Sequence, residues 1–328
     1  MVPIAPAAPV MRIVGTEPEP IASGDPPAAP GPAMDITGNM ITTDELRRTL
    51  GPLGIWMPPP SRIGVEPESY AREIEAAGFT SVWYPGVNSA ADLAAVEPAL
   101  AATQRLVLGT GIASVWTWQP ADLAAAAQRL ESLYPGRFVL GLGVSHAPAV
   151  EAAGQAYSKP YTKMVRFLDE LPAVPVPVIL AALGPRMLEL SRDRAAGAHP
   201  YFSPPGHTAF ARQVLGPAPL LVPEIAVSLT PGDAGAAQAR DYAKFYLRLP
   251  NYTGNLLRSG YTGADIEGGG SDRLMADVVP HGPEASLAGI TAHLDAGADH
   301  VVVQLLGDGG RFAPGDLRAL SEVTAGLR

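Results

Sequence analysis

Apolar segments alternate with helical segments along most of this chain, and this alternation constrains the fold more than any other feature. Each apolar segment is hydrophobic throughout rather than at every second residue, and each is followed by a helical pattern. Strands of this kind, separated by helices, are typical of a parallel sheet covered on both sides. The eight predicted strands are 53–57, 81–86, 105–115, 137–146, 176–183, 198–204, 220–230 and 300–306.

Eight strand–helix units over residues 51–328 predict an α/β fold of the (β/α)₈ or TIM-barrel type. A doubly wound sheet is the alternative, but it carries its glycine-rich fingerprint after the first strand, and GPLGIWMPPPSR (51–62) has no such loop. The predicted helices are 65–78, 92–103, 120–136, 159–171, 184–197, 207–216, 282–298 and 313–327, with a helical insertion at about 233–280.

The first 50 residues differ from the rest because they are rich in proline and alanine. They hold nine of the 35 prolines and show almost no periodicity. Proline fixes φ and removes a backbone donor, so this extension is predicted to be extended or disordered rather than part of the barrel.

Composition excludes several classes of function. The net charge of −9, without a basic run, argues against nucleic acid as a partner. The chain has no cysteine, and its six histidines fall in no metal-binding motif, so no metal site is predicted. No apolar run approaches membrane-spanning length and no signal peptide is evident, which favours a cytoplasmic protein acting on a small molecule.

Active sites of such barrels lie at the carboxyl ends of the strands. Three of these ends are rich in glycine: LGTGI (108–112), GLGVSH (141–146) and AALGPRM (181–187). Glycine lets a flat ligand or a phosphate approach the backbone, although tight turns alone also require it. Gly184 opens a predicted helix whose free N–H groups attract anions, with Arg186 in the first turn and Ser203 and His207 at the next helix.

The order of these motifs resembles the luciferase-like flavin and deazaflavin oxidoreductases, most closely the actinobacterial branch that uses coenzyme F420. The residues that carry the resemblance are LVLGTGI (106–112), LYPGRFVLGLG (133–143), LAALGPRMLELSRDRAAGAHPYF (180–202) and LDAGADHVVVQLL (294–306). The resemblance covers residues 51–328. It implies coenzyme F420 as cofactor, with FMN as the alternative, and a homodimer.

Carried over residue by residue, the resemblance implies a non-prolyl cis peptide at Gly111–Ile112 behind the cofactor ring. Gly143 is expected beneath the cofactor. The phosphate-bearing tail is expected against Leu183, Gly184 and Arg186, together with Ser203 and His207.

His146 is the predicted catalytic residue, because imidazole can give or take a proton near neutral pH. The alternatives are a histidine that binds the cofactor or substrate and one that only bonds to a neighbouring strand end. His146 stands where the sugar-phosphate branch of the family has an acidic proton donor. That branch also has a catalytic histidine where this chain has Val87, which argues against a sugar-phosphate substrate. Trp56, Tyr84 and Trp116 stand at the ends of predicted strands and are expected to line a substrate pocket; packing between loops is the alternative role.

Three functions remain open from the sequence. The first is a deazaflavin-dependent oxidoreductase that moves a hydride to or from a small organic substrate. The second is an FMN-dependent monooxygenase on the same barrel. The third is a non-catalytic cofactor-binding or pathway protein, which the loss of histidine at Val87 and the unusual leader favour.

Overall fold

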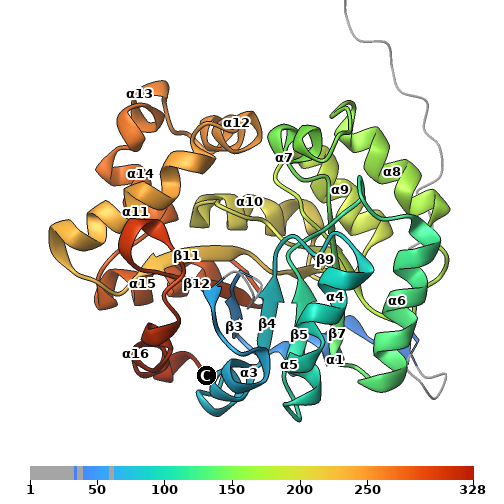
Figure 1. Cartoon of the computed structure of the whole chain (residues 1–328). Coiled ribbons are helices and arrows are strands. Elements are labelled where there is room, and N and C mark those ends of the chain that lie inside the picture. Colours follow the sequence, from blue (N-terminus) through green and yellow to red (C-terminus); the bar gives the residue numbers. More distant parts are fainter. Residues whose placement is uncertain (1–32, 35–39, 59–62) are drawn as a thin grey trace, which may run out of the picture.

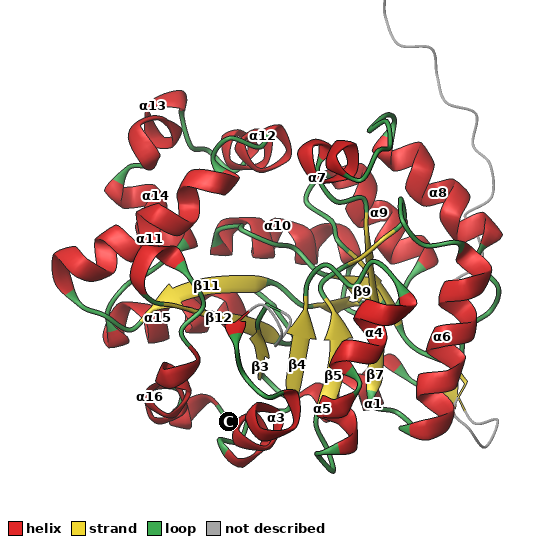
Figure 2. Ribbon diagram, viewed as in Figure 1, coloured by secondary structure: helices red, strands yellow, loops and turns green. Residues whose placement is uncertain are grey.

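In the computed structural model, which describes residues 33–34, 40–58 and 63–328, a parallel sheet forms the centre of the chain and helices surround it (Figures 1 and 2). All pairings in this sheet are parallel. Its strands are β3 (Leu53–Trp56), β4 (Ser81–Tyr84), β5 (Val107–Thr110), β6 (Ala113–Ser114), β7 (Phe138–Gly143), β8 (Val178–Leu180), β9 (Gly197–Ala198), β10 (Leu220–Leu221), β11 (Glu224–Ser228) and β12 (Val301–Leu306).

The sheet closes on itself as a barrel. Its order is β10-β9-β8-β7-β5-β4-β3-β12-β11, so the two ends of the order, β10 and β11, are consecutive pieces of one segment. Only Val222 and Pro223 separate them. The N–H of Val222 bonds to the carbonyl of Ala198 on one side, and the carbonyl of Pro223 accepts from Val302 on the other. The predicted (β/α)₈ barrel is confirmed.

The helices follow the strands in the expected alternation. They are α1 (Thr43–Leu50), α3 (Pro67–Ala76), α4 (Ala90–Val96), α5 (Pro98–Ala101), α6 (Pro120–Leu133), α7 (Ala147–Ala152), α8 (Pro160–Glu170), α9 (Pro185–Arg194), α10 (Pro205–Leu215), α11 (Gly232–Tyr246), α12 (Pro250–Arg258), α13 (Gly263–Ile266), α14 (Asp272–Val278), α15 (Pro283–Asp295) and α16 (Leu317–Val323). Helices α11 to α14 occupy the region predicted as an insertion, and Figure 1 shows α12 and α13 at the top, the end to which β4 and β5 point.

Alternate residues of each strand face two separate cores. Ile55, Val82 and Leu108 pack outward against the surrounding helices. Trp56, Trp83 and Val107 pack inward, in a cluster that fills the barrel. Both faces of the strands are therefore buried, which is why the sequence is apolar throughout these segments.

The leader boundary at residue 50 was wrong, because residues 43–50 form α1. Thr42 caps this helix in a reciprocal arrangement with Glu45. Its buried Leu46 and Leu50 belong to the cluster inside the barrel. Ala33–Met34 (β1) and Met40–Ile41 (β2) pair antiparallel, and the rest of the leader lies outside the described residues.

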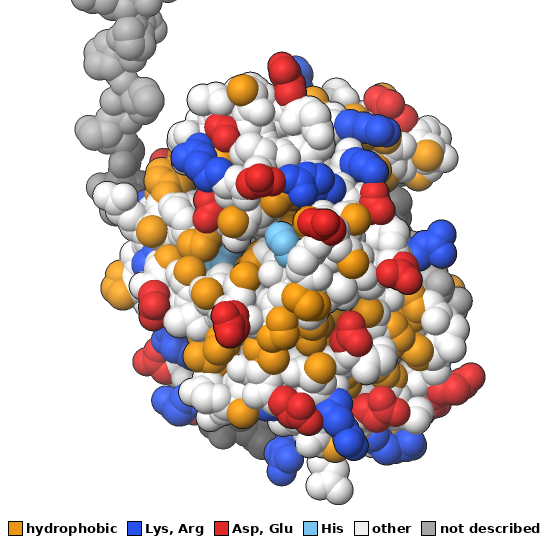
Figure 3. All heavy atoms as spheres, turned by 90° about the vertical axis from the view of Figure 1, so that its left-hand side faces the viewer, with side chains coloured by type: hydrophobic (Ala, Val, Ile, Leu, Met, Phe, Trp, Pro, Cys, Tyr) orange, Lys and Arg blue, Asp and Glu red, His pale blue; other side chains and the backbone are white. Residues whose placement is uncertain are grey.

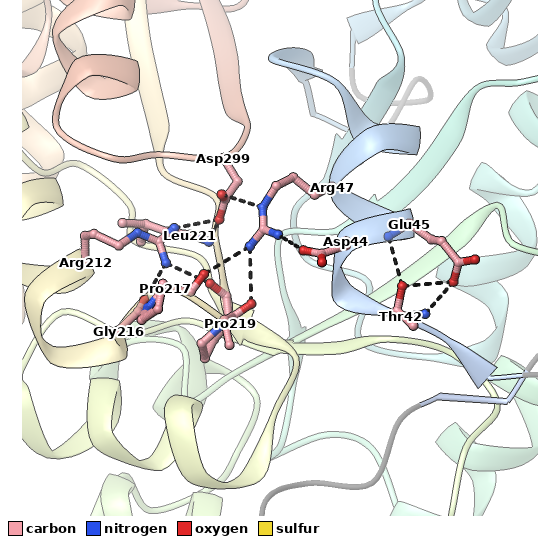
Figure 4. Close-up of polar contacts among 11 residues, drawn as sticks. Thr42, Asp44, Glu45, Arg47, Arg212, Gly216, Pro217, Pro219, Leu221 and Asp299 are labelled. Carbon is pink, nitrogen blue, oxygen red and sulfur yellow. Dashed lines mark hydrogen bonds and ion pairs between the residues drawn. The ribbon is translucent and has the colours of Figure 1, made fainter.

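An ion-pair network holds α1 against the barrel (Figure 4). The two carboxylate oxygens of Asp299 pair with Arg47 at 2.7 Å and with Arg212 of α10 at 2.6 Å. One of them also accepts the backbone N–H of Leu221 at 2.8 Å. One carboxylate thus joins α1, α10 and β10 at the end of the barrel opposite the predicted site.

Several predicted elements are interrupted or shorter than expected, and three of them matter for the site or its neighbourhood. The helix at 92–103 is interrupted as α4 and α5, because Pro98 has no N–H to continue the hydrogen-bond ladder. The third strand, 105–115, is interrupted at residues 111 and 112 between β5 and β6. The sixth, 198–204, is reduced to β9, and the residues after it contribute to the site.

The surface carries both signs of charge. Figure 3 shows acidic and basic side chains interspersed on one face, with hydrophobic side chains between them. Within the described part of the chain, no helix has the length and hydrophobicity needed to cross a membrane.

Candidate functional site

The carboxyl ends of β3, β5, β7 and β9 form the floor of the candidate site. The Gly111–Ile112 peptide bond is cis, as the resemblance implied. Both residues are partly exposed, whereas β5 before them is buried. A Cβ atom on Gly143 would lie 2.5 Å from Cγ1 of Ile112. The adjoining strand ends therefore approach each other at a distance that only glycine allows.

Two polar atoms without partners meet above Gly111. A Cβ atom on this glycine would lie 3.1 Å from Nε2 of His199 and 3.2 Å from Nε1 of Trp56. Both nitrogens are buried and unbonded. Trp56 offers a donor. His199 donates from Nδ1 to the carbonyl of Val222 at 2.6 Å, so its Nε2 is an acceptor.

His199 remains neutral at ordinary pH, because burial lowers its pKa to about 4. Its ring also stacks on Trp83 inside the barrel, with the centroids 5.1 Å apart. The floor thus presents one fixed donor and one fixed acceptor. The sequence analysis did not assign His199 to the site, although its position directly after β9 was a usable signal.

His146 stands at the edge of this floor, half-buried, directly before α7. Ser145 before it has φ of 54°, a left-handed conformation that is uncommon outside glycine and turns the chain here. Nε2 of His146 lies 3.5 Å from the hydroxyl of Tyr252, and Nδ1 is buried without a partner. Burial lowers the pKa of His146, so the imidazole is neutral at pH 7.

A cluster of tyrosines connects His146 with Trp56. The ring of Tyr201 lies 5.5 Å from Trp56 and 6.2 Å from Tyr252, which in turn lies 5.4 Å from His146. Tyr201 follows β9, whereas Tyr252 comes from α12. The insertion therefore supplies one wall of the site, and sequence reasoning missed this wall because it depends on how the insertion folds back.

Of the predicted phosphate-binding residues, Leu183, Gly184 and His207 lie together. Nε2 of His207 donates to the carbonyl of Leu183 at 2.8 Å, and its Nδ1 is buried without a partner, as is Oγ of Ser203. Gly184 is the N-cap of α9, and no side chain caps this helix. Arg186 is exposed in its first turn, with its guanidinium 4.1 Å from the ring of Tyr161.

Arg258 of α12 joins this corner and was not predicted. Its Nη2 atom is 3.9 Å from where a Cβ on Gly184 would lie, and its charge contributes to lowering the pKa of His207, after burial. The corner therefore combines a free helix N-terminus with a cation and unpartnered polar side chains, which together suit an anionic ligand.

The three predicted pocket residues lie in different surroundings. Trp56 is in the floor. Trp116 donates from Nε1 to the carbonyl of Val144 at 2.7 Å, which holds it beside the loop that carries His146. Tyr84 was wrong as a pocket residue, because it points outward and is buried among the surrounding helices. Residues alternate across a strand, and Trp83 rather than Tyr84 faces inward.

Val87 stands where the sugar-phosphate branch has a catalytic histidine. It is buried in the outer core, so this position supplies no titratable group to the site. Among the described residues, no group of three or more His, Asp or Glu side chains is placed to hold a metal ion.

Comparison with known proteins agrees with this architecture. Residues 66–174 match the family model described as luciferase-like monooxygenase. A 5,10-methylenetetrahydromethanopterin reductase of Methanolobus tindarius is 27% identical over 154 residues, which are 39% of this chain and 47% of the relative. The matched region spans about half the length of the curated relatives.

Solved structures share the barrel over nearly their whole length. An F420-dependent secondary alcohol dehydrogenase, in complex with an F420-acetone adduct, has a TM-score of 0.65 at 16% identity, over 85% of this chain and 99% of that one. The oxygenating constituent of 3,6-diketocamphane monooxygenase from Pseudomonas putida, in complex with FMN, has a TM-score of 0.59 at 13% identity, over 84% and 96%. The barrel is common to all three chains, and residues 66–174 of this one are similar to the family model described as luciferase-like monooxygenase.

Proposed function

We propose that this protein is a coenzyme F420-dependent oxidoreductase that transfers a hydride between the deazaflavin and a small organic substrate. The observation that carries the proposal is the floor at Gly111, where a donor on Trp56 and an acceptor on His199 lie close to the glycine, buried and without partners. The similarity to an F420-dependent reductase and dehydrogenase supports the choice of cofactor.

The residues fit both ends of such a cofactor. A flat ring could lie against the closely packed strand ends at Gly111 and Gly143, and its polar edge could bond to the donor on Trp56 and the acceptor on His199. The anionic tail suits the N-terminus of α9 at Gly184 and the guanidinium of Arg258. A bound phosphate would also favour protonation of His207, whose Nδ1 would then donate as well.

When bound, the deazaflavin supplies the hydride donor or acceptor. The protein supplies orientation and a dry site. The aromatic wall of Trp56, Tyr201 and Tyr252 excludes water from the mouth. His146, neutral at pH 7 because burial lowers its pKa, is suited to accept a proton from a substrate hydroxyl or to orient a substrate oxygen.

Titration of the purified chain with coenzyme F420 and, in parallel, with FMN tests the cofactor, with fluorescence as the readout. Micromolar binding of the deazaflavin alone is expected. Arg258→Ala should weaken it about tenfold or more, because a charge-assisted contact contributes about 1.5 to 3 kcal/mol. Arg318→Ala, on α16, is the control and should bind as the wild type does. Tight binding of FMN alone would favour the monooxygenase, and binding of neither would overturn the proposal.

Replacement of His146 tests the chemistry. His146→Ala should keep the deazaflavin affinity and lose about 10²-fold or more in turnover, which is the usual contribution of a group that transfers a proton. Equal turnover by this variant would show that His146 does not take part. Binding without turnover in the wild type, across a broad set of alcohols, ketones and imines, would instead favour a non-catalytic cofactor-binding protein.

A further inference from the structure

One carboxyl group inside the barrel takes no part in the function proposed above. Glu224 begins β11, and its side chain is almost completely buried, with 1% of its surface exposed. Two groups lie near its oxygens: the backbone N–H of Phe202 and the hydroxyl of Tyr242, each at 3.4 Å. Burial and these two hydrogen-bond donors are the described influences on the ionisation of Glu224, and neither donor is a cation.

The contacts indicate a neutral carboxylic acid. An ionised carboxylate draws hydroxyl donors to about 2.5–2.7 Å and N–H donors to about 2.7–2.9 Å, whereas the hydroxyl of Tyr242 and the N–H of Phe202 both lie at 3.4 Å. A buried, unpaired charge is costly, and such a group binds a proton instead. Burial accordingly raises the pKa of Glu224 to about 8.

Hydrogen bonds extend from Glu224 to the mouth of the barrel. Tyr242 of α11 contacts Glu224, and its hydroxyl lies 2.8 Å from that of Tyr201. Tyr201 also contacts the hydroxyl of Tyr246 at 2.8 Å, and both Tyr201 and Tyr242 lie 3.1 Å from the side-chain oxygen of Gln304. Tyr201 is partly exposed and its ring lies against Trp56, at the floor of the site.

Counting protons supports the same protonation state. These five oxygen–oxygen contacts involve three phenols, which carry one proton each, and two acceptors, Gln304 and Glu224. With an ionised carboxylate, at most three of the five contacts contain a hydrogen. A protonated Glu224 allows a fourth contact to contain a hydrogen, so fewer pairs of oxygens lie close together without a hydrogen between them.

We infer that Glu224 stores a proton and, through Tyr242, delivers it to Tyr201, which gives it to the substrate during reduction; this use of the proton rests on the proposed function. At pH 7 the His146 ring is neutral, whereas the contacts of Glu224 indicate that this carboxyl group holds a proton, so Glu224 can supply a proton for reduction under conditions in which His146 carries no extra one. The electron pair enters the substrate as hydride, and the substrate heteroatom takes the proton of Tyr201. Tyr201 then takes the proton of Tyr242, and Tyr242 that of Glu224, whose carboxylate recovers a proton from water.

Glu224 and Tyr242 act through Tyr201 and are therefore positioning residues. The groups that face this path come from every neighbouring element: Tyr246 from α11, Tyr252 from α12, Gln304 from β12 and the backbone of Phe202 from the segment after β9. The charged form of Glu224 has no cationic partner among the described groups, so its protonation responds directly to pH.

Infrared spectroscopy of the full chain without cofactor tests the stored proton. A protonated carboxylic acid has a carbonyl stretch, sensitive to D₂O, that is separate from the amide bands. This band is expected at pH 6, is expected to disappear with a midpoint near pH 8, and should be missing in Glu224→Gln. Glu75→Gln is the control, since backbone N–H groups hold the Glu75 carboxyl in its ionised form and its removal should leave the band unchanged.

A second variant keeps the test independent of how well Glu224→Gln folds. Tyr242→Phe should shift the frequency of the acid band without removing it, because a hydrogen-bond partner is lost. A band that is missing at pH 6 in the wild type, or unaffected by Tyr242→Phe, would overturn the inference. Since no cofactor is present, this result is separate from failure of the fluorescence titration.

Turnover then tests delivery of the proton. Glu224→Gln should reduce carbonyl or imine substrates about 10²-fold more slowly and lose the fall in rate that the wild type shows above pH 8, with cofactor affinity unchanged. Tyr201→Phe should lower the rate of reduction by as much. A Glu224→Gln variant with the wild-type pH profile would show that the stored proton is not delivered.

Discussion

Single atoms decide how closely the strands that carry the site approach one another. Thr110 donates its hydroxyl to the carbonyl of Gly141 and accepts the N–H of the same residue, both at 2.8 Å. From the sequence, glycines here are expected to let a flat ligand approach the backbone. The structure gives a steric reason, since a Cβ on Gly141 would lie 1.9 Å from the carbonyl oxygen of Thr110.

Gly141→Ala should therefore lower the free energy of unfolding by about 3 kcal/mol, because the obstacle is backbone and cannot rotate away. Denaturant unfolding of the full chain measures this. Gly206→Ala is the matched control, because a Cβ there meets nothing within 4 Å and its φ is not positive. Equal stability of the two variants would contradict the argument.

The element that the sequence most misjudged is α1. Its sequence, TDELRRTL, follows the proline-rich segment and was assigned to the leader. A capping box at Thr42 begins the helix, and Leu46 and Leu50 cover the inside of the barrel. Eight residues are too few for a stable isolated helix, so its contacts with the barrel must maintain it.

Asp299→Ala should release α1, because it leaves Arg47 and Arg212 without their shared carboxylate. The side chains are only 14% to 28% exposed, so we expect a loss of about 2 to 3 kcal/mol, together with faster amide exchange in residues 43–50. Asp44→Ala is the control. Asp44 pairs with the same arginine but is 75% exposed, so its loss should cost less than about 1 kcal/mol.

The whole molecule should be most stable near pH 6 to 7 because its buried titratable groups oppose one another. Burial lowers the pKa of His199 and His300 to about 4 and that of His293 to about 3. The unfolded chain binds protons on these rings below about pH 6.5 and the folded chain does not. Stability is therefore lost as the pH falls from about 6.5 to 4, at up to about 1.4 kcal/mol per pH unit for each ring.

Glu224 acts in the opposite direction. Its folded pKa of about 8 exceeds the ordinary value of 4.5, so the folded chain binds the proton more tightly. Stability then falls as the pH rises from about 4.5 to 8, again by up to about 1.4 kcal/mol per pH unit. Thermal unfolding from pH 4 to 9 measures both limbs. Glu224→Gln should abolish the alkaline fall and steepen the acid limb between about pH 4.5 and 6.5, where Glu224 opposes the histidines. An unaltered alkaline limb would contradict this assignment.

The sequence by itself determined the barrel and the order of its strands. Strands buried on both faces must be apolar throughout, and this pattern can be recognised within a short stretch of sequence. The sequence also predicted that His146, the glycine-rich strand ends and Gly184 lie at one end of the barrel, since the carboxyl ends of parallel strands meet there. The cis peptide at Gly111–Ile112 came from family resemblance.

Only the tertiary structure decided which side chains share the site. Whether Trp83 or Tyr84 faces into the barrel depends on the register of β4, because a shift of one residue exchanges the two faces of a strand. The insertion folds back over the mouth and brings Tyr242, Tyr252 and Arg258 there. Helix α1 packs against the opposite end of the barrel, although its sequence reads as part of the leader. Such placements depend on contacts between residues far apart in the chain, which local periodicity does not reveal.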